Sequence, residues 1–541
     1  MKLINQWRDS GFHYLFGLYC IANFFLLINY SGVYWDDWTL VNQDPATILN
    51  AFAQSGFWWM GYFHVFLQSI GNGIYIYRLI SFFSYFFSGI LLYYILKRLN
   101  YFSKKTLFFL ILIFLIAPIN DARVALINTP SILTLCQFYF AFFLLSIYLD
   151  SDKKIYIRLL ILSLFFISFC LESLLVFYAI VLCYILIKVY QQNQNEEILS
   201  LLKIFLTQYL DFICLPFIFF GFKHVFLQPY GLYAGYNSLH FNFLNLIHMI
   251  AQSFSTSLYA PILQALNSLG KFWVTPIILG VVIYTLGRAR GSFPDQPSPP
   301  QQSSNITIKT MLIPGVVLFL VAVFPYCAVG KLPDLNNWAS RNQVLVPLSM
   351  AFLVYYLVLQ SAVIHKKVPV ILLNLLITSF IVQTLYSHYL YDLDWFYQRS
   401  LLAQFKQSKV FQKNTTFIAK DNLEMDIWVH NRGLDFYEVN GLLKKAFNED
   451  TRLLVHDITA IDLFARYKVY PQYNFSHWVK NTPVYIELSK NDGFPLTPSR
   501  QFWLFYDSVF NIDTFENSIR SLTKIQYLTP SEVVSKEEKL N

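Results

Sequence analysis

The chain of 541 residues is 56% hydrophobic and only 13% charged, which is too apolar a composition for a soluble protein of this length. Its formal net charge of +8 does not indicate nucleic-acid binding, because the basic residues stand in short loops between apolar runs. We therefore expect an integral membrane protein whose basic loops set its orientation.

Apolar runs along the chain predict a mainly α-helical, polytopic membrane protein with about eleven transmembrane helices. One run is ambiguous, since Leu159 to Ile187 is apolar apart from Glu172. As one helix it would be roughly 43 Å long, too long for a hydrocarbon core of about 30 Å, whereas each of two helices would be short. The placement of the basic loops decides for two short helices that meet near Glu172. The predicted spans lie near 12–30, 74–96, 106–119, 131–149, 158–171, 173–190, 204–222, 272–287, 310–329, 343–364 and 368–388.

The interpretation with two short helices also places the loops rich in Lys and Arg on one side, which is the cytoplasmic side by the positive-inside rule. The outer face then receives Glu172, the long segment near 223–271 and everything after about residue 389. The Pro-, Gln- and Ser-rich stretch 291–305 is expected inside, as a flexible linker.

The first outer loop contains the sequence YWDDW directly after the first apolar run. Asp44 suits a helix N-cap and Pro45 a first helical position, so the aromatic segment that follows is predicted to form interfacial helices. Asp36 and Asp37 then stand between a spanning and an interfacial helix. A carboxylate beside another carboxylate near apolar surface tends to have a raised pKa, which suits proton abstraction. The alternative is that both aspartates only mark the water boundary.

Residues 390–541 are more highly charged than the membrane part at 1–389. Strand-like pieces such as TTFIAK and TRLLVHDI alternate there with helical pieces such as VNGLLKKAF. This alternation predicts a small C-terminal α/β domain, soluble and extracytoplasmic.

With these features the sequence resembles the GT-C class of membrane glycosyltransferases. The resemblance rests on the acidic pair Asp36-Asp37, the interfacial helices after it, the many spans and the soluble domain outside. It implies inverting transfer of a sugar from a polyprenyl-phosphate-linked donor to a glycan, lipid or protein acceptor. In this class an acidic residue of the first outer loop acts as base or helps to hold a divalent metal ion. That role falls here to Asp36 or Asp37, with a slight preference for Asp36 as the base.

A donor linked through phosphate requires fixed cations close to the bilayer surface. Arg341 is the first candidate because it stands just above a predicted span and follows Trp338. The alternative for Arg341 is that its side chain only snorkels to the membrane interface. The alternative for Arg123 is an ion pair with Asp121. Glu172 is a carboxylate inside an apolar run, which by default marks a functional or buried polar site. The candidate substrate-binding residues are Arg341, Arg123, Lys223, His224, Lys331 and Glu172.

We expect the transferase to lie in the plasma (inner) membrane of a bacterium. Two other functions are alternatives to a transferase. A transporter or flippase of lipid-linked glycans usually has internal repeats and charges at the membrane midplane, whereas the polar groups here gather on one face. An O-antigen polymerase-like enzyme also acts outside, but the acidic pair fits it less well. The sequence contains no Walker-type phosphate loop, no GxSxG motif and no Cys/His zinc spacing. It identifies neither the sugar nor any cofactor.

Overall fold

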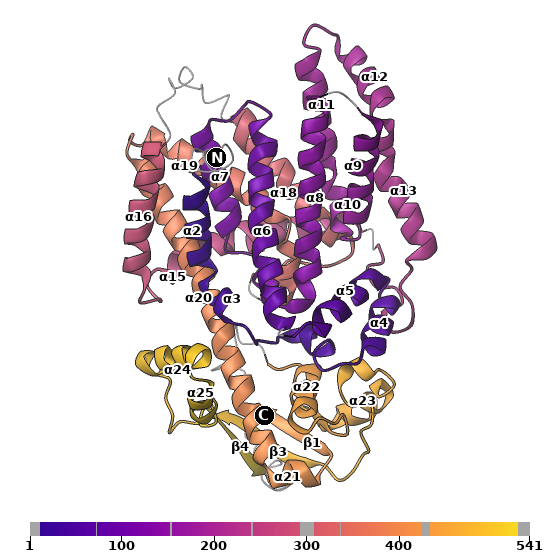
Figure 1. The fold of residues 1–541 in the computed structure, drawn as a ribbon, viewed down its shortest axis with the longest axis vertical. Helices are drawn as coiled ribbons and strands as arrows, with labels where there is room; N and C mark the ends of the chain where they lie inside the picture. The colour runs from indigo at the N-terminus through magenta and orange to yellow at the C-terminus, as the bar shows by residue number, and fades with distance from the viewer. Residues whose placement is uncertain are drawn as a thin grey trace.

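The computed structural model describes residues 11–71, 73–151, 154–239, 242–292, 308–335, 337–423 and 433–528. A bundle of helices forms most of the molecule, and a small α/β domain lies against one end of it (Figure 1). The expected mainly helical fold with a small C-terminal sheet is therefore confirmed.

Among the described residues, six helical segments are both long and apolar enough to cross a membrane by themselves. A bent pair, α12 (Ile198–Gln208) and α13 (Leu210–Phe226), forms a seventh candidate with a kink of 55°. Helices occupy all of the predicted spans, but several of them are short, so the predicted total of eleven crossings is not confirmed. The six segments are Gly73–Lys97 (α6), Leu126–Tyr148 (containing α8, Thr129–Tyr148), Ser173–Gln192, Thr310–Ala328 (containing α18, Ile313–Ala328), Val346–Val363 (containing α19, Val346–Gln360) and Val368–Gln407 (α20). The shorter helices are α2 (Phe12–Ala22), α3 (Phe24–Ile28), α7 (Lys104–Ile116), α9 (Ile155–Ser168) and α16 (Thr275–Ser292).

The apolar run around Glu172 does form two separate helical segments, as predicted. Helix α9 ends at Ser168, and α10 (Ser173–Phe177) starts after a turn and leads into α11 (Ala179–Gln192). The 14 residues of α9 are only about 21 Å long, which is less than the thickness of the hydrocarbon core. The turn at Glu172 therefore stops short of the bundle's end, where α5 lies (Figure 1).

Two short helices, α4 (Pro45–Gln54) and α5 (Trp58–Ser69), lie between the bundle and the C-terminal domain (Figure 1). The Asp44 carboxylate accepts the backbone N–H of Thr47 at 2.9 Å, so the predicted N-cap is confirmed. The sequence did not predict α14 (Phe243–Phe254) and α15 (Ala260–Ser268), which fill the expected outer segment and are joined by one turn of π-helix.

Helix α20 runs without a break from the bundle into the C-terminal domain (Figure 1). The boundary expected between residues 389 and 390 therefore falls inside a helix. Among the described residues of this domain, four strands form a sheet in the order β2-β1-β3-β4. Strand β1 (Thr416–Asp421) is parallel to β2 (Leu453–Val455) and to β3 (Val484–Lys490), and β4 (Thr523–Leu528) is antiparallel to β3. The helices of the domain are α21 (Lys409–Lys413), α22 (Phe436–Phe447), α23 (Ile461–Tyr467), α24 (Pro498–Phe510) and α25 (Ile512–Ile519).

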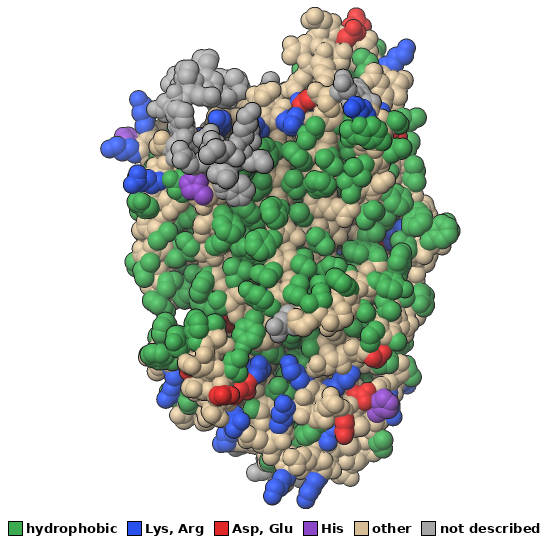
Figure 2. All heavy atoms as spheres, in the orientation of Figure 1, with side chains coloured by type: hydrophobic (Ala, Val, Ile, Leu, Met, Phe, Trp, Pro, Cys, Tyr) green, Lys and Arg blue, Asp and Glu red, His purple; other side chains and the backbone are tan. Residues whose placement is uncertain are grey.

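Hydrophobic side chains cover the middle of the molecule, and charged side chains gather towards its two ends (Figure 2). At the end far from the C-terminal domain, α6 ends at Lys97, α7 begins at Lys104 and α20 begins after Lys367 (Figure 1). This distribution is typical of an integral membrane protein. By the positive-inside rule, that end is expected to face the cytoplasm.

A matched pair of cysteine variants tests this orientation. Val363 and Val479 are both exposed, the first near the start of α20 and the second in the C-terminal domain. We expect a membrane-impermeant maleimide to label Val479→Cys in intact cells and Val363→Cys only after permeabilisation. The parent chain with its native cysteines is the background control. Labelling of both variants from the same side would contradict the orientation.

Candidate functional site

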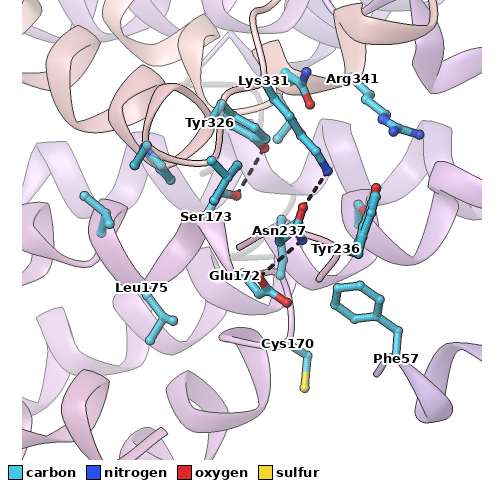
Figure 3. Close-up of a pocket in the computed structure, with 18 of the residues that line it drawn as sticks. Phe57, Cys170, Glu172, Ser173, Leu175, Tyr236, Asn237, Tyr326, Lys331 and Arg341 are labelled. Atoms are coloured by element: carbon cyan, nitrogen blue, oxygen red, sulfur yellow. Dashed lines mark hydrogen bonds between the residues drawn. The ribbon is translucent and has the colours of Figure 1, made fainter. Parts of the chain in front are cut away.

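A cavity of about 500 Å³ lies where the turn at Glu172 faces α5, α13 and the segment after α18. Its wall is largely apolar and includes Phe57, Leu175, Phe220 and Phe324. The polar side chains that line it include Glu172, Asn237, Lys331 and Arg341, which are labelled in Figure 3, and Lys223. Four of the six predicted substrate-binding residues therefore line one cavity.

The polar side chains on the Glu172 side form one connected chain of contacts. Glu172 accepts an ion pair from Lys223 at 2.7 Å and lies 3.4 Å from the amide nitrogen of Asn237. The Lys331 ammonium donates to the amide oxygen of Asn237 at 2.5 Å and stands 3.8 Å from the ring centre of Tyr236 (Figure 3). Asn237 thus bridges a carboxylate and a cation that come from distant parts of the sequence.

Arg341 connects the cavity to the first outer loop. It stands on a short 3₁₀ helix, η7 (Trp338–Gln343), and its guanidinium lies 4.0 Å from the ring centre of Trp338. One guanidinium nitrogen, Nη1, is 3.9 Å from Oδ2 of Asp36. Asp36 does not line the cavity itself, but through Arg341 it stands at the cavity's edge.

The Asp36 side chain is 33% exposed and faces a cation and a tyrosine hydroxyl. Desolvation raises the pKa of this carboxyl group, while the Arg341 charge and the nearby Tyr437 hydroxyl, which donates to Asp435 at 2.7 Å, act in the opposite direction. Burial raises the pKa of Tyr233 and of Tyr437, and the nearby charge of Asp36 raises both further. The result is a carboxylate of increased basicity between the cavity and the C-terminal domain.

The neighbouring Asp37 has a different environment. Its side chain is fully buried, and its two oxygens accept backbone N–H groups from Ile127 at 2.9 Å and from Tyr34 at 3.2 Å. Burial raises the pKa of Asp37 to about 7, although these hydrogen bonds oppose the shift. Asp37 therefore holds the first outer loop against the start of α8 and is a positioning residue.

Trp35 places Asp36 through an unusual backbone conformation. Its φ of 48° lies in the left-handed region, which a bulky side chain rarely adopts and which costs about 1–3 kcal/mol. The Trp35 N–H donates at 2.8 Å to the buried carboxylate of Glu438, which also accepts the Asp435 N–H at 2.9 Å at the start of α22. The C-terminal domain thus holds the backbone next to Asp36.

Two predicted residues lie elsewhere. Arg123 is buried, donates to the side-chain oxygen of Asn23 at 2.5 Å and stands 5.1 Å from the ring centre of Tyr85. His224 is exposed on α13, and its ring nitrogen Nδ1 is 2.7 Å from the Gln228 amide. Neither side chain lines the cavity.

Several residues of the site had no clear signal in the sequence. Tyr236 and Asn237 belong to the tyrosine-rich stretch YGLYAGYN, which suits sugar stacking and a membrane interface equally well. Glu438 could not be recognised because its partner, the backbone of Trp35, is 403 positions away in the chain.

The aspartate pair is a poor ligand set for the metal ion that the family resemblance implies. Among the described residues, no group of three or more His, Cys, Asp or Glu side chains comes together. Asp37 uses both oxygens for backbone N–H groups, and Asp36 faces a guanidinium. The carboxylates therefore fit roles in positioning and proton transfer better than metal binding.

The chain matches no known protein-family model, no curated protein and no solved structure. Its function therefore has to be inferred from the geometry of the cavity and of the loop beside it.

Exchange of each aspartate for asparagine separates the two roles. In Asp37→Asn the new amide group faces a backbone N–H and leaves a buried donor unpaired, so we expect a loss of about 1–3 kcal/mol of stability. Asp36→Asn, at a partly exposed position, should stay within about 0.5 kcal/mol of the parent. Thermal unfolding in detergent measures both changes, and equal effects of the two exchanges would contradict the assignment.

The effect of Asp37→Asn should also depend on pH. The folded-state pKa of about 7 is above the ordinary aspartate value of 3.8, so the parent loses stability as the pH rises through this range. The stability difference between parent and variant should therefore be larger at pH 5 than at pH 8. A difference that grows with pH would contradict the raised pKa.

Proposed function

We propose that this protein is a membrane glycosyltransferase, similar to the GT-C class, which moves a sugar from a polyprenyl-phosphate-linked donor to an acceptor. One observation supports this function above others. A single cavity combines an apolar wall with a cluster of cations, and a carboxylate of raised pKa stands at its edge. A lipid-linked phosphosugar requires this combination, because one end of it is apolar, its middle is anionic and its reacting carbon needs a base nearby.

The isoprenoid part of the donor suits the apolar wall. Phe220 lines the cavity and is also 55% exposed on the outer surface of α13. Its neighbours Phe217 and Ile218 are exposed on the same helix. A tail leaving the cavity beside Phe220 would pass directly onto a surface that suits lipid, so only the first part of the tail needs space inside.

The charges near the cavity suit a phosphodiester. Of the described side chains there, Lys223, Lys331 and Arg341 are cations, and Glu172 and Asp36 are carboxylates. The charged side chains that line the cavity have an excess of positive charge, which suits the negative charge of a sugar-phosphate-polyprenyl diester. Arg341 is the best placed of the three, because its planar guanidinium offers two parallel donors and is fixed on the Trp338 ring.

The transfer step follows from this placement. The acceptor hydroxyl oxygen bonds to the anomeric carbon of the sugar while its proton passes to the Asp36 carboxylate. The bond from that carbon to the phosphate oxygen breaks, and its electron pair leaves with the polyprenyl phosphate. Arg341 and Lys331 stabilise the extra negative charge on this leaving group. A single displacement of this kind inverts the anomeric configuration.

The acceptor approaches from the side of the C-terminal domain. Tyr233 of the membrane part and Tyr437 of α22 both lie close to Asp36. Aromatic rings with a hydroxyl group suit the faces and edges of sugars, and they suit lipid or protein acceptors that carry a hydroxyl group. We place this face on the outside of a bacterial plasma (inner) membrane, because the basic loops lie at the opposite end.

Exchange of the base tests the proposed chemistry. Asp36→Asn keeps the shape of the side chain but removes its basicity, so transfer should fall by at least about a hundredfold. Binding of the donor and thermal stability should be retained. Asp334→Asn is the matched control, since Asp334 is an exposed aspartate in the loop that leads to Arg341.

The measurement is sugar transfer by the purified protein from a panel of polyprenyl-phosphate sugars. Transfer by Asp36→Asn at the parental rate would remove the base from the proposal. A parent that transfers no sugar but moves lipid-linked glycans across vesicle membranes would show a transporter instead.

The Arg341 charge gives a prediction about pH. Arg341 lowers the pKa of Asp36, and the base must be unprotonated to react. In Arg341→Ala the acidic limb of kcat/KM should therefore move to higher pH, and use of the donor should weaken. Arg341→Lys keeps the charge and should leave that limb nearly in place, but it should recover only part of the donor affinity, because lysine lacks the planar fork. An acidic limb unchanged in Arg341→Ala would exclude the coupling.

A further inference from the structure

Helix α24 of the C-terminal domain has two apolar faces, and the first packs against the bundle. Leu504 is buried, and the Phe505 ring lies 5.1 Å from Phe25 in α3 and 5.2 Å from Tyr389 in α20, between ring centres. The Tyr30 hydroxyl donates to the backbone oxygen of Ser508 at 3.0 Å. This face docks α24 on the outer end of the bundle.

The second apolar face has no partner among the described residues. At 100° per residue its members fall within an arc of about 120°, and their exposed fractions run from 38% to 68%. They are Phe502, Trp503, Tyr506, Val509 and Phe510. Arg500 and Asp507 occupy the remaining side of the helix. A helix of a water-facing domain rarely exposes so many large apolar side chains together.

The position of α24 indicates what covers this face. The helix lies across the bundle axis at the end of the apolar part of the molecule (Figure 1). On the face drawn in Figure 2, hydrophobic side chains extend from the middle of the molecule down to this level, and charged side chains begin below it. The exposed aromatic face thus continues the surface that the bundle presents to lipid.

Contacts between rings place α24 at the level of an exposed tryptophan of the bundle. Tyr389, which contacts Phe505, also lies 5.4 Å from Phe272. The next residue, Trp273, is exposed just before α16 begins. Tryptophan side chains of membrane proteins concentrate where acyl chains meet headgroups. Trp503 and Trp273 therefore fit one aromatic belt.

We propose that α24 is an interfacial helix that rests its second apolar face in the outer leaflet of the bilayer. Arg500 and Asp507 then face water and headgroups, as the polar side of such a helix should. The C-terminal domain is held to the membrane surface by this contact in addition to α20. Its partner is a lipid surface, and the inference does not depend on the transferase activity.

Photo-crosslinking in lipid nanodiscs tests the proposal on the full chain. The photoreactive residue p-benzoyl-phenylalanine is placed at Trp503 or Phe510 on the apolar face, and at Arg500 or Asp507 as matched positions on the polar side. We expect irradiation to give lipid adducts at least about tenfold more often at the apolar positions, measured by intact mass. Equal adduct yields at all four positions, or crosslinks to a second copy of the chain, would overturn the proposal.

A second measurement uses only a conservative exchange. Lipids with brominated acyl chains quench tryptophan fluorescence at short range, and Trp503→Phe removes one of eleven tryptophans. The brominated lipids should quench the fluorescence of Trp503, so Trp503→Phe should remove fluorescence from the quenched fraction. Trp478 is buried in the same domain, so Trp478→Phe should remove fluorescence from the unquenched fraction. Absence of quenching of the Trp503 contribution would also overturn the proposal.

Discussion

The strained backbone at Trp35 is the constraint on which the candidate site depends. A left-handed conformation at a bulky residue persists only where the surroundings hold it. Glu438 holds the N–H of Trp35 itself, and Asp37 holds the N–H of the residue before it. Hydrogen bonds to carboxylates are stronger than those between neutral groups, which offsets the strain. Asp36 lies between Trp35, whose N–H is held, and Asp37, whose carboxylate is held, and its side chain is the one that meets Arg341.

The same interaction explains why the C-terminal domain belongs to the site. The carboxylate of Glu438 caps the start of α22 and binds the loop of the membrane part at the same time. Gly441, one turn further along α22, leaves room for the Trp38 ring, because a Cβ atom there would lie 2.5 Å from that ring. With α20 continuous between both parts, the domain is fixed against the loop that carries Asp36 and is not a loosely tethered module.

The short helices around Glu172 explain how charge can stand within an apolar bundle. A carboxylate at this depth is costly unless it is paired, and Lys223 and Asn237 supply the partners. Because α9 ends early, the turn at Glu172 lines a cavity whose wall is largely apolar and includes several charged side chains. A substrate that is part lipid and part anion matches both environments at once.

The sequence by itself determined the features that depend on local patterns. Apolar runs indicated the membrane helices, Asp44 and Pro45 indicated the start of α4, and the basic loops favoured a break near Glu172. The piece TTFIAK contains all of strand β1 except its last residue, Asp421, and TRLLVHDI contains strand β2. Each of these signals lies within a few residues of the feature that it predicts, so no knowledge of distant contacts is needed.

Only the tertiary structure decided which groups meet. It separated Asp36 at the cavity edge from Asp37 in the interior, although the two have the same chemistry and are adjacent in the chain. It brought Arg341 to Asp36 and left Arg123 in a buried contact with Asn23. It also carried α20 past the compositional boundary, because a helix ends where its capping and packing end and not where hydrophobicity falls. These outcomes depend on contacts between residues separated by 100 to more than 400 positions, and no local pattern encodes them.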